Sequence, residues 1–253
     1  MSVPLQQIVE ELDQLLRHHE GGQDWPAAKN GLQVECRTPI SRIAAAVDAT
    51  LPVIQKAIAL RTQLLLVHHG LFWSSIEPLI GIAYEKVRLC ILHNLAIYSS
   101  HLPLDAHEQH GNAVGLLRAI SLPKGEPFLE CKGWKVGRLV DVDLSVQELL
   151  ERCQAATGTP PRLVNKATDR VGRLAVVTGS ASELFHELNR YQVQTFLSGE
   201  GPHWTAGLAE ELEINLIYAG HYATETFGVR SVAAWCAQRW GIDYHFIDHP
   251  SGL

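Results

Sequence analysis

Hydrophobic residues in the first half of the chain alternate between helical spacing and short continuous runs. Leu5, Ile8 and Leu12 recur at helical spacing, which predicts an opening helix with Pro4 suited to its first turn. Short apolar runs are typical of buried strands, and longer amphipathic segments of helices. The pattern predicts strands at 43–47, 63–67 and 95–99, and helices at 51–60, 79–94 and 111–120. Because strands that alternate with helices pair in parallel, an α/β domain is expected.

A stretch without sustained periodicity, 122–133, follows this domain, and Pro123, Gly125 and Pro127 interrupt it. We therefore expect a first domain at 1–122, completed by 225–253, and a second at 123–224. Beyond the boundary the pattern predicts strands at 136–142, 174–177, 193–197, 214–218 and 244–247, and helices at 182–191, 202–212 and 225–240. A further helix begins at Ser145, where Glu148 completes a capping box. The predicted fold is two linked α/β domains of similar layout with mixed, largely parallel sheets.

Composition narrows the functional classes. The net charge of −6, from 21 Lys and Arg against 27 Asp and Glu, argues against a broad surface for nucleic acid or an anionic membrane, although a local basic patch is compatible with it. No apolar stretch reaches the roughly 20 residues of a membrane span, and the N-terminus lacks the pattern of a secretory signal. The 5 cysteines are scattered and never spaced CxxC, so neither a disulfide framework nor a thiolate zinc site is expected. A cytoplasmic location fits these features.

Histidines and carboxylates follow three predicted parallel strands, at the end where open α/β sheets bind ligands. They are His68 and His69 after 63–67, His101 and Asp105 after 95–99, and His221 and Glu225 after 214–218. A single histidine after a strand is ordinarily a loop or core residue, but convergence of three segments favours a metal site. We therefore predict that His68, His69, Asp105, His221 and Glu225 ligate zinc, iron or manganese.

Two details of spacing constrain this site. Adjacent strand residues point to opposite faces, so His68 and His69 are expected to turn with the chain at Gly70 in order to serve one centre. His221 and Glu225 lie four residues apart, on one face of a starting helix. Since a carboxylate has two oxygens, Glu225 is a candidate bridge between two cations.

The sequence evidence for a functional role is weaker in other polar segments. Val177–Ser182 combines a strand, a small-residue turn and a helix start, which suits either a phosphate or an ordinary turn. Glu200 and His203 follow the strand 193–197 and could line the same cleft or simply lead into a helix. The remaining histidines are read as ordinary surface or loop residues: His18, His19, His93, His107, His110, His186, His245 and His249.

Five segments together resemble the Nif-three-like family, whose members are often labelled GTP cyclohydrolase I type 2 homologs. They are Asn30–Val34 (NGLQV), Val67–Gly70 (VHHG), Ser100–Asp105 (SHLPLD), Ser198–Glu200 (SGE) and Gly220–Glu225 (GHYATE). The resemblance spans essentially the whole chain and includes no inserted domain. Tyr222 stands where other members often have His, which leaves the proposed ligands unchanged.

The resemblance implies a dinuclear metal centre between the two domains and a homohexameric toroid. Carried over by motif, His69 and Asp105 resemble ligands of one ion, His68 and His221 those of the other, and Glu225 the bridge. We expect two divalent cations per chain, and a small-molecule substrate because an enclosed ring admits no folded macromolecule.

The leading functional hypothesis is a metal-dependent hydrolase acting on a nucleotide or related heterocycle. His101 is the candidate proton shuttle and Glu200 a second candidate. The alternative is a non-catalytic metal-binding scaffold that serves as a regulatory or partner-binding protein.

Overall fold

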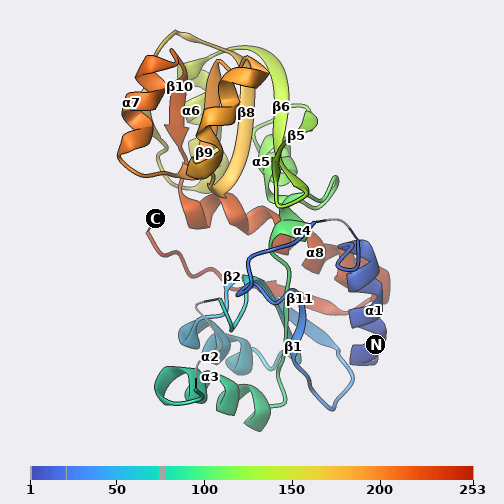
Figure 1. Ribbon diagram of the computed structural model, residues 1–253. Helices are drawn as coiled ribbons and strands as arrows, with labels where there is room; N and C mark the ends of the chain where they lie inside the picture. The colour runs from blue at the N-terminus through green and yellow to red at the C-terminus, as the bar shows by residue number, and fades with distance from the viewer. Residues whose placement is uncertain (1, 21, 74–77, 253) are drawn as a thin grey trace. The chain divides into compact units, whose positions relative to one another are not determined.

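The computed structural model describes residues 2–20, 22–73 and 78–252 (Figure 1). Strands and helices alternate along the chain, as the sequence predicts. Contacts between residues divide the chain into unit 1, Met1–His107 with Gly228–His249, and unit 2, Glu108–Phe227 with Pro250–Leu253. Each unit is built around one sheet. The chain thus leaves unit 1, forms unit 2 and returns to complete unit 1.

Unit 1 contains a 5-stranded sheet in the order β1-β4-β3-β2-β11. Its strands are β1 (Gly31–Val34), β2 (Arg42–Asp48), β3 (Leu64–His69), β4 (Ala96–Ser99) and β11 (Asp243–Phe246). All pairs are parallel except β1 with β4. Its helices are α1 (Leu5–Leu15), α2 (Leu51–Ala59), α3 (Gly81–Leu92), α4 (Leu102–Asp105) and the C-terminal part of α8 (His221–Trp240).

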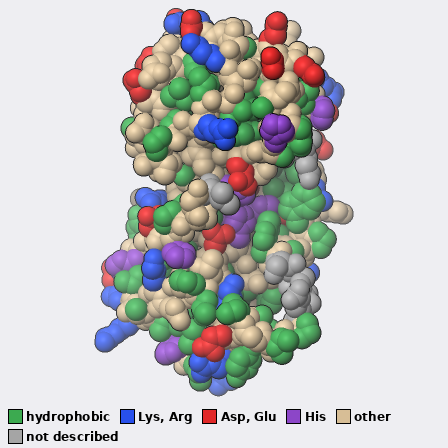
Figure 2. Space-filling model, turned by 90° about the vertical axis from the view of Figure 1, so that its left-hand side faces the viewer, with side chains coloured by type: hydrophobic (Ala, Val, Ile, Leu, Met, Phe, Trp, Pro, Cys, Tyr) green, Lys and Arg blue, Asp and Glu red, His purple; other side chains and the backbone are tan. Residues whose placement is uncertain are grey.

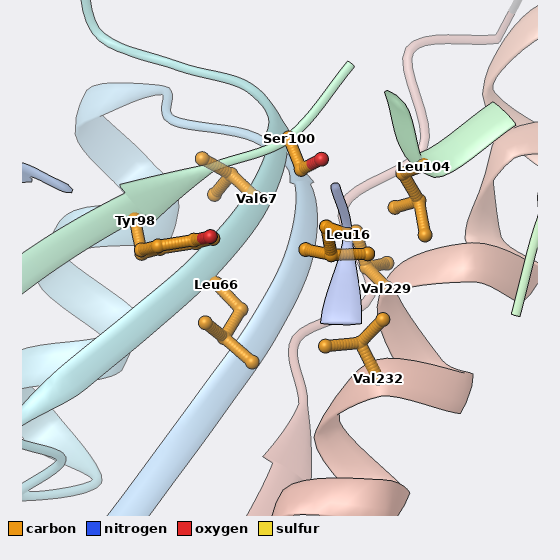
Figure 3. A pocket seen from close by; sticks show the side chains of 8 residues that line it. All are labelled: Leu16, Leu66, Val67, Tyr98, Ser100, Leu104, Val229 and Val232. Atoms are coloured by element: carbon orange, nitrogen blue, oxygen red, sulfur yellow. The ribbon is translucent and has the colours of Figure 1, made fainter. Parts of the chain in front are cut away.

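Helices cover both faces of this sheet, because alternate strand residues point to opposite sides. Leu64 and Leu66 pack with side chains of α1 and α8, whereas Leu65 and Val67 pack with side chains of α2 and α3. A cavity of about 10 Å³ lies beside the first of these cores, and Figure 3 shows the eight side chains that line it. This cavity has room for about one water molecule, so it is not a substrate site.

Unit 2 contains a 6-stranded sheet in the order β5-β6-β8-β9-β10-β7. Its strands are β5 (Glu126–Cys131), β6 (Trp134–Ser145), β7 (Arg162–Asn165), β8 (Arg170–Ser180), β9 (Thr195–Glu200) and β10 (Asn215–Tyr218). Strands β8, β9 and β10 are parallel and the outer pairs are antiparallel. The helices are α5 (Asn112–Ala119), α6 (Val146–Thr157), the 3₁₀ helix η1 (Ser182–Tyr191), α7 (Trp204–Glu211) and the start of α8.

The core of unit 2 places α5 and α6 against one face of its sheet, where Leu117 and Leu149 pack with Leu197 of β9. The Ser145 half of the predicted capping box forms, since Ser145 Oγ accepts a hydrogen bond from the Glu148 N–H at 3.1 Å, whereas the Glu148 carboxylate pairs with Arg152 at 2.6 Å. Because α5 packs on this core, the chain passes into unit 2 before the boundary that the sequence placed at 122.

Several elements differ from the sequence prediction. Strand β5 contains Pro127, which the pattern treated as an interruption; β5 is an edge strand, where a missing N–H is tolerated. The short elements β1, β7 and α4 have too few residues to show periodicity. The helix expected at 182–191 is 3₁₀, and its buried Phe185 and Leu188 are three residues apart, as three residues per turn requires. Helix α8 begins at His221 instead of Glu225.

Helix α3 and the residues just before it carry exposed apolar side chains. On the helix, Ile91 and Leu92 are 66% and 62% exposed, and Ile82 and Tyr84 are more than half exposed. Leu79 and Ile80, which precede the helix, are 54% and 74% exposed. Cys90 of the same helix is buried in the core of unit 1. Because clustered apolar side chains are ordinarily covered, residues 79–92 form an unusual surface.

Charged side chains are dispersed over the rest of the visible surface. On the face shown in Figure 2, Lys and Arg lie among acidic and hydrophobic side chains without forming a continuous basic area. None of the helices in the described ranges has the length and hydropathy needed to cross a membrane. All 5 cysteines are free thiols.

Candidate metal centre

Three histidines of unit 1 gather at the carboxyl ends of β3 and β4. The ring centroid of His68 lies 4.8 Å from that of His69 and 4.9 Å from that of His101. One nitrogen from each ring can be chosen so that the three lie within 4.8 Å of one another. Contrary to the expected turn at Gly70, β3 continues through His69. The rings of His68 and His69 nevertheless lie close together, with their planes inclined at 46°.

Each of these imidazoles is held through Nδ1. His68 Nδ1 lies 3.0 Å from the Ser100 carbonyl oxygen, His69 Nδ1 2.8 Å from Asp48 Oδ1, and His101 Nδ1 2.9 Å from Asp24 Oδ1. A carbonyl or ionised carboxylate only accepts hydrogen bonds, so Nδ1 is the donor in every case. In the neutral ring the proton-free nitrogen is then Nε2, which is the arrangement found in histidines that bind metals.

A carboxylate lies beside the buried ring of His68. Asp105, at the end of α4, places its Oδ2 3.4 Å from His68 Nε2. Both residues are buried. Nitrogen and carboxylate oxygen donors of this kind suit a divalent cation.

A second imidazole and carboxylate pair lies in unit 2, on the first turn of α8. His221 Nε2 is 3.2 Å from Glu225 Oε2, as the spacing of four residues predicts. His221 Nδ1 lies 2.8 Å from Glu200 Oε1, so this ring is also held through Nδ1. Burial disfavours the charged ring, but hydrogen bonds and charges from Glu225 and Glu200 outweigh it and raise the pKa of His221 to about 9.

Glycines make room for this pair. A Cβ on Gly179, whose φ is +63°, would clash with Glu225 Oε1 and lie 3.3 Å from His221 Nε2. A Cβ on Gly199 would lie 2.8 Å from the His221 Cα. The segment 177–182, weighed above as a phosphate turn, is strand β8 through Ser180 and then the start of η1, and its glycine accommodates Glu225.

The other polar and aromatic residues near these sites differ in their surroundings. Glu200 contacts His221, whereas His203 is exposed at the start of α7. Trp73 packs against the histidines of unit 1, with its ring centroid 4.7 Å from His69 and 4.5 Å from His101. His18 differs from the ordinary surface reading, because its side chain is 6% exposed and Nε2 lies 2.9 Å from Ser100 Oγ.

Sequence reasoning missed two carboxylates that hold imidazoles of unit 1. Asp48 ends β2 and pairs in register with His69 on β3, so the strand-end rule that selected the histidines would also have selected Asp48. Asp24 lies in a loop 77 residues from His101, and no periodicity or motif marks it. Trp73 likewise follows a strand end without a sequence signal of its own.

Both units therefore combine an α/β sheet with imidazole and carboxylate groups that could hold a metal ion. The profile of the DUF34/NIF3 family (NGG1p interacting factor 3) matches residues 3–251, and the chain belongs to this family.

Relatives and solved structures agree with this assignment. The chain is 38% identical over 226 residues to a Deinococcus radiodurans protein named GTP cyclohydrolase 1 type 2 homolog, covering 88% of this chain and 86% of that one. An Archaeoglobus fulgidus protein of the same name is 35% identical, covering 98% and 99%. The crystal structure of a Thermus thermophilus protein matches with a TM-score of 0.89 and 34% identity, covering 100% of both chains. The mixed α/β fold with two sheets is thus that of the family.

Proposed function

We propose that this protein is a metal-dependent hydrolase that binds two divalent cations per chain and acts on a nucleotide or a related heterocycle. The observation that carries the proposal is that four imidazoles are anchored in the same way, each with Nδ1 held by a protein oxygen. They are His68, His69, His101 and His221. This arrangement leaves Nε2 for a metal or a proton. The name of the curated relatives, homologs of a GTP cyclohydrolase, supports a nucleotide as substrate.

In this proposal His69 and Asp105 would hold one ion, His68 and His221 would hold the other, and Glu225 would contribute a carboxylate to both. The set of nitrogen and oxygen donors suits zinc, iron or manganese. When bound, such ions supply Lewis-acid chemistry, which makes water more acidic and stabilises developing negative charge.

The protein's own residues move the proton and orient the ligands. His101 Nε2 accepts the proton of the attacking water and returns it to the leaving group. Glu200, the second catalytic candidate, has Oε1 at His221 Nδ1, so we assign it to orienting His221. Trp73, which is 37% exposed, packs on His69 and His101 and limits their contact with water.

The test is a panel of nucleotides incubated with protein reconstituted in turn with zinc, manganese and iron, with products identified by mass. We expect turnover of at least one member, and its loss together with the bound metal in Glu225→Ala. Glu210→Ala, on an exposed turn of α7 in the same unit, is the matched control and should retain both. Metal binding without turnover of any nucleotide would contradict the hydrolase and favour the scaffold hypothesis.

We also propose that the chain assembles with copies of itself, as the expected homohexamer requires. The exposed apolar side chains of residues 79–92 support this proposal. These six side chains each present on the order of 100 Å² and together roughly 600–800 Å², close to the ~800 Å² per partner of a stable interface. Glu85 and Arg88, paired at 2.7 Å within the helix, could exchange partners across a twofold axis between two such helices.

A further inference from the structure

His101 differs from the other three anchored imidazoles in having no metal assigned to it. Its ring is held like those of His68, His69 and His221, and it lies 4.9 Å from the ring of His68. The ligand set proposed above is complete without it. The same anchoring is therefore available at this position for a role other than holding a metal.

Asp24 makes four hydrogen bonds around the turn that carries His101. Its Oδ1 accepts from His101 Nδ1 at 2.9 Å and from the Trp25 N–H at 2.7 Å. Its Oδ2 accepts from Asn30 Nδ2 at 2.8 Å and from the Leu102 N–H at 3.0 Å. The carboxylate thus contacts both the ring of His101 and the backbone of the next residue.

Asn30 completes this arrangement, because its Oδ1 accepts from the His101 N–H at 2.7 Å. The side chains of Asp24 and His101 are each 9% exposed, so water does not compete for these bonds. Burial alone would favour the neutral acid, but the hydrogen bond and charge of His101 and the hydrogen bonds from Asn30 and Trp25 outweigh it and lower the pKa of Asp24. An ionised carboxylate can only accept, which requires a proton on His101 Nδ1.

We propose that Asp24 is a positioning residue that fixes His101 as the Nδ1–H tautomer and so makes Nε2 its proton-accepting atom. The role of that atom in catalysis rests on the proposed hydrolase, whereas the tautomer does not. Asn30 fixes the backbone of the same turn and leaves the choice of ring nitrogen to Asp24. Nε2 is then the ring nitrogen left to accept a proton.

The experiment is nitrogen NMR of histidine-labelled full-length protein, metal-free and zinc-loaded, with the His101 signals assigned by their loss in His101→Asn. We expect wild-type His101 to be protonated at Nδ1 and proton-free at Nε2. In Asp24→Asn the amide can donate as well as accept, so the ratio of the two tautomers should shift toward Nε2–H by roughly tenfold. Asp24→Glu should restore much of the wild-type ratio.

Asp13→Asn is the matched control. It removes another half-buried carboxylate of unit 1 that holds an imidazole, since Asp13 Oδ1 lies 3.1 Å from His18 Nδ1. This variant should lose stability and leave the His101 tautomer unchanged. Where a nucleotide is turned over, Asp24→Asn should lower kcat at least tenfold with little change in KM, because a base is affected and not the binding of substrate.

The outcomes separate the two proposals. Wild-type His101 protonated at Nε2, or an unchanged ratio in folded Asp24→Asn, would overturn the positioning role whatever the activity. The expected tautomers in a protein that turns over no nucleotide would leave Asp24 as the positioning residue and refute the hydrolase. If Asp24→Asn does not fold, the wild-type tautomer still decides.

Discussion

Asp48 Oδ1 lies 2.8 Å from His69 Nδ1, and the two residues are paired in register at the ends of neighbouring parallel strands. The carboxylate selects the ring nitrogen that carries the proton and fixes the rotation of the ring. It also adds negative charge next to a proposed ligand, which makes the imidazole a stronger donor. The position of this contact in the sheet means that strand pairing itself aligns the ligand.

Asp48→Asn should therefore weaken metal binding without unfolding unit 1. Removal of a carboxylate behind a metal-binding histidine typically lowers affinity about 10- to 100-fold. Titration calorimetry or competition with a chelating dye measures the change. Asp141→Asn, which removes an exposed partner of Arg173 in unit 2, is the control, and equal affinities in the two variants would contradict the role of Asp48.

Gly179→Ala should destabilise unit 2 and reduce its metal content. The residue has φ of +63°, which costs an L-amino acid roughly 1–2 kcal/mol, and the added Cβ meets Glu225 Oε1. Thermal denaturation and elemental analysis measure the two effects. Gly207→Ala on α7 is the matched substitution, because nothing lies within 4 Å of its Cβ position.

Gly207→Ala should raise helix stability by about 0.5–1 kcal/mol, since alanine is the better helix former. The metal content of this variant should equal that of the wild type. If Gly179→Ala had the same melting temperature and metal content as Gly207→Ala, the close approach of Gly179 to Glu225 would be unimportant for stability and metal binding.

Stability of unit 1 should depend on pH through Asp13. Burial raises its pKa, but hydrogen bonds from His18 and Tyr98 and the charges of His18 and His19 outweigh burial and lower it below the ordinary value. A lowered folded pKa contributes stability above the unfolded value of about 3.9, and this stability is lost as pH falls through the folded pKa. Asp13→Asn should cost about 1–2 kcal/mol at neutral pH.

The difference between Asp13→Asn and wild type should shrink as pH falls below the unfolded value of about 3.9 and through the lowered folded pKa, where the wild-type carboxylate gains its proton. Denaturant melts of metal-free protein across this range measure it. A constant difference at all pH values would mean that the charge of Asp13 contributes nothing.

Ile91→Glu combined with Ile80→Glu should prevent self-association through α3. Both side chains are largely exposed in the single chain, so the charges should leave the fold intact. Light scattering is expected to give a multiple of 28.0 kDa for wild type and a smaller mass for the variant. Thr159→Glu, exposed in unit 2, should assemble like wild type. A wild-type mass of one chain would remove the assembly proposal.

The sheet cores and the places of the histidines could be predicted from the sequence because both depend on local patterns. Apolar runs such as 63–67 mark strands, and the chain order alone places His68 and His221 just after them. By contrast, the anchoring of His101 depends on a contact with Asp24, 77 residues away, that no local pattern encodes.

Pro127 shows a second limit of local reasoning. A proline in the middle of a run predicts an interruption, yet the position of β5 at the edge of the sheet removes the need for its N–H. Edge and centre are properties of the folded sheet. The adjacent His68 and His69 give a third case, since strand geometry predicts opposite directions while the observed rings lie 4.8 Å apart.

The return of the chain to unit 1 reverses the order in which the two units can finish folding during translation. Unit 2 is almost wholly contained in Glu108–Phe227, so all of its strands leave the ribosome before α8 is complete. Unit 1 still lacks the core residues Val229 and Val232 and the edge strand β11 at that time. Synthesis proceeds at about 5–20 residues per second. The N-terminal unit, although made first, therefore waits for the last residues of the chain, and a nascent chain stalled before Gly228 should expose the uncovered face of its sheet to chaperones.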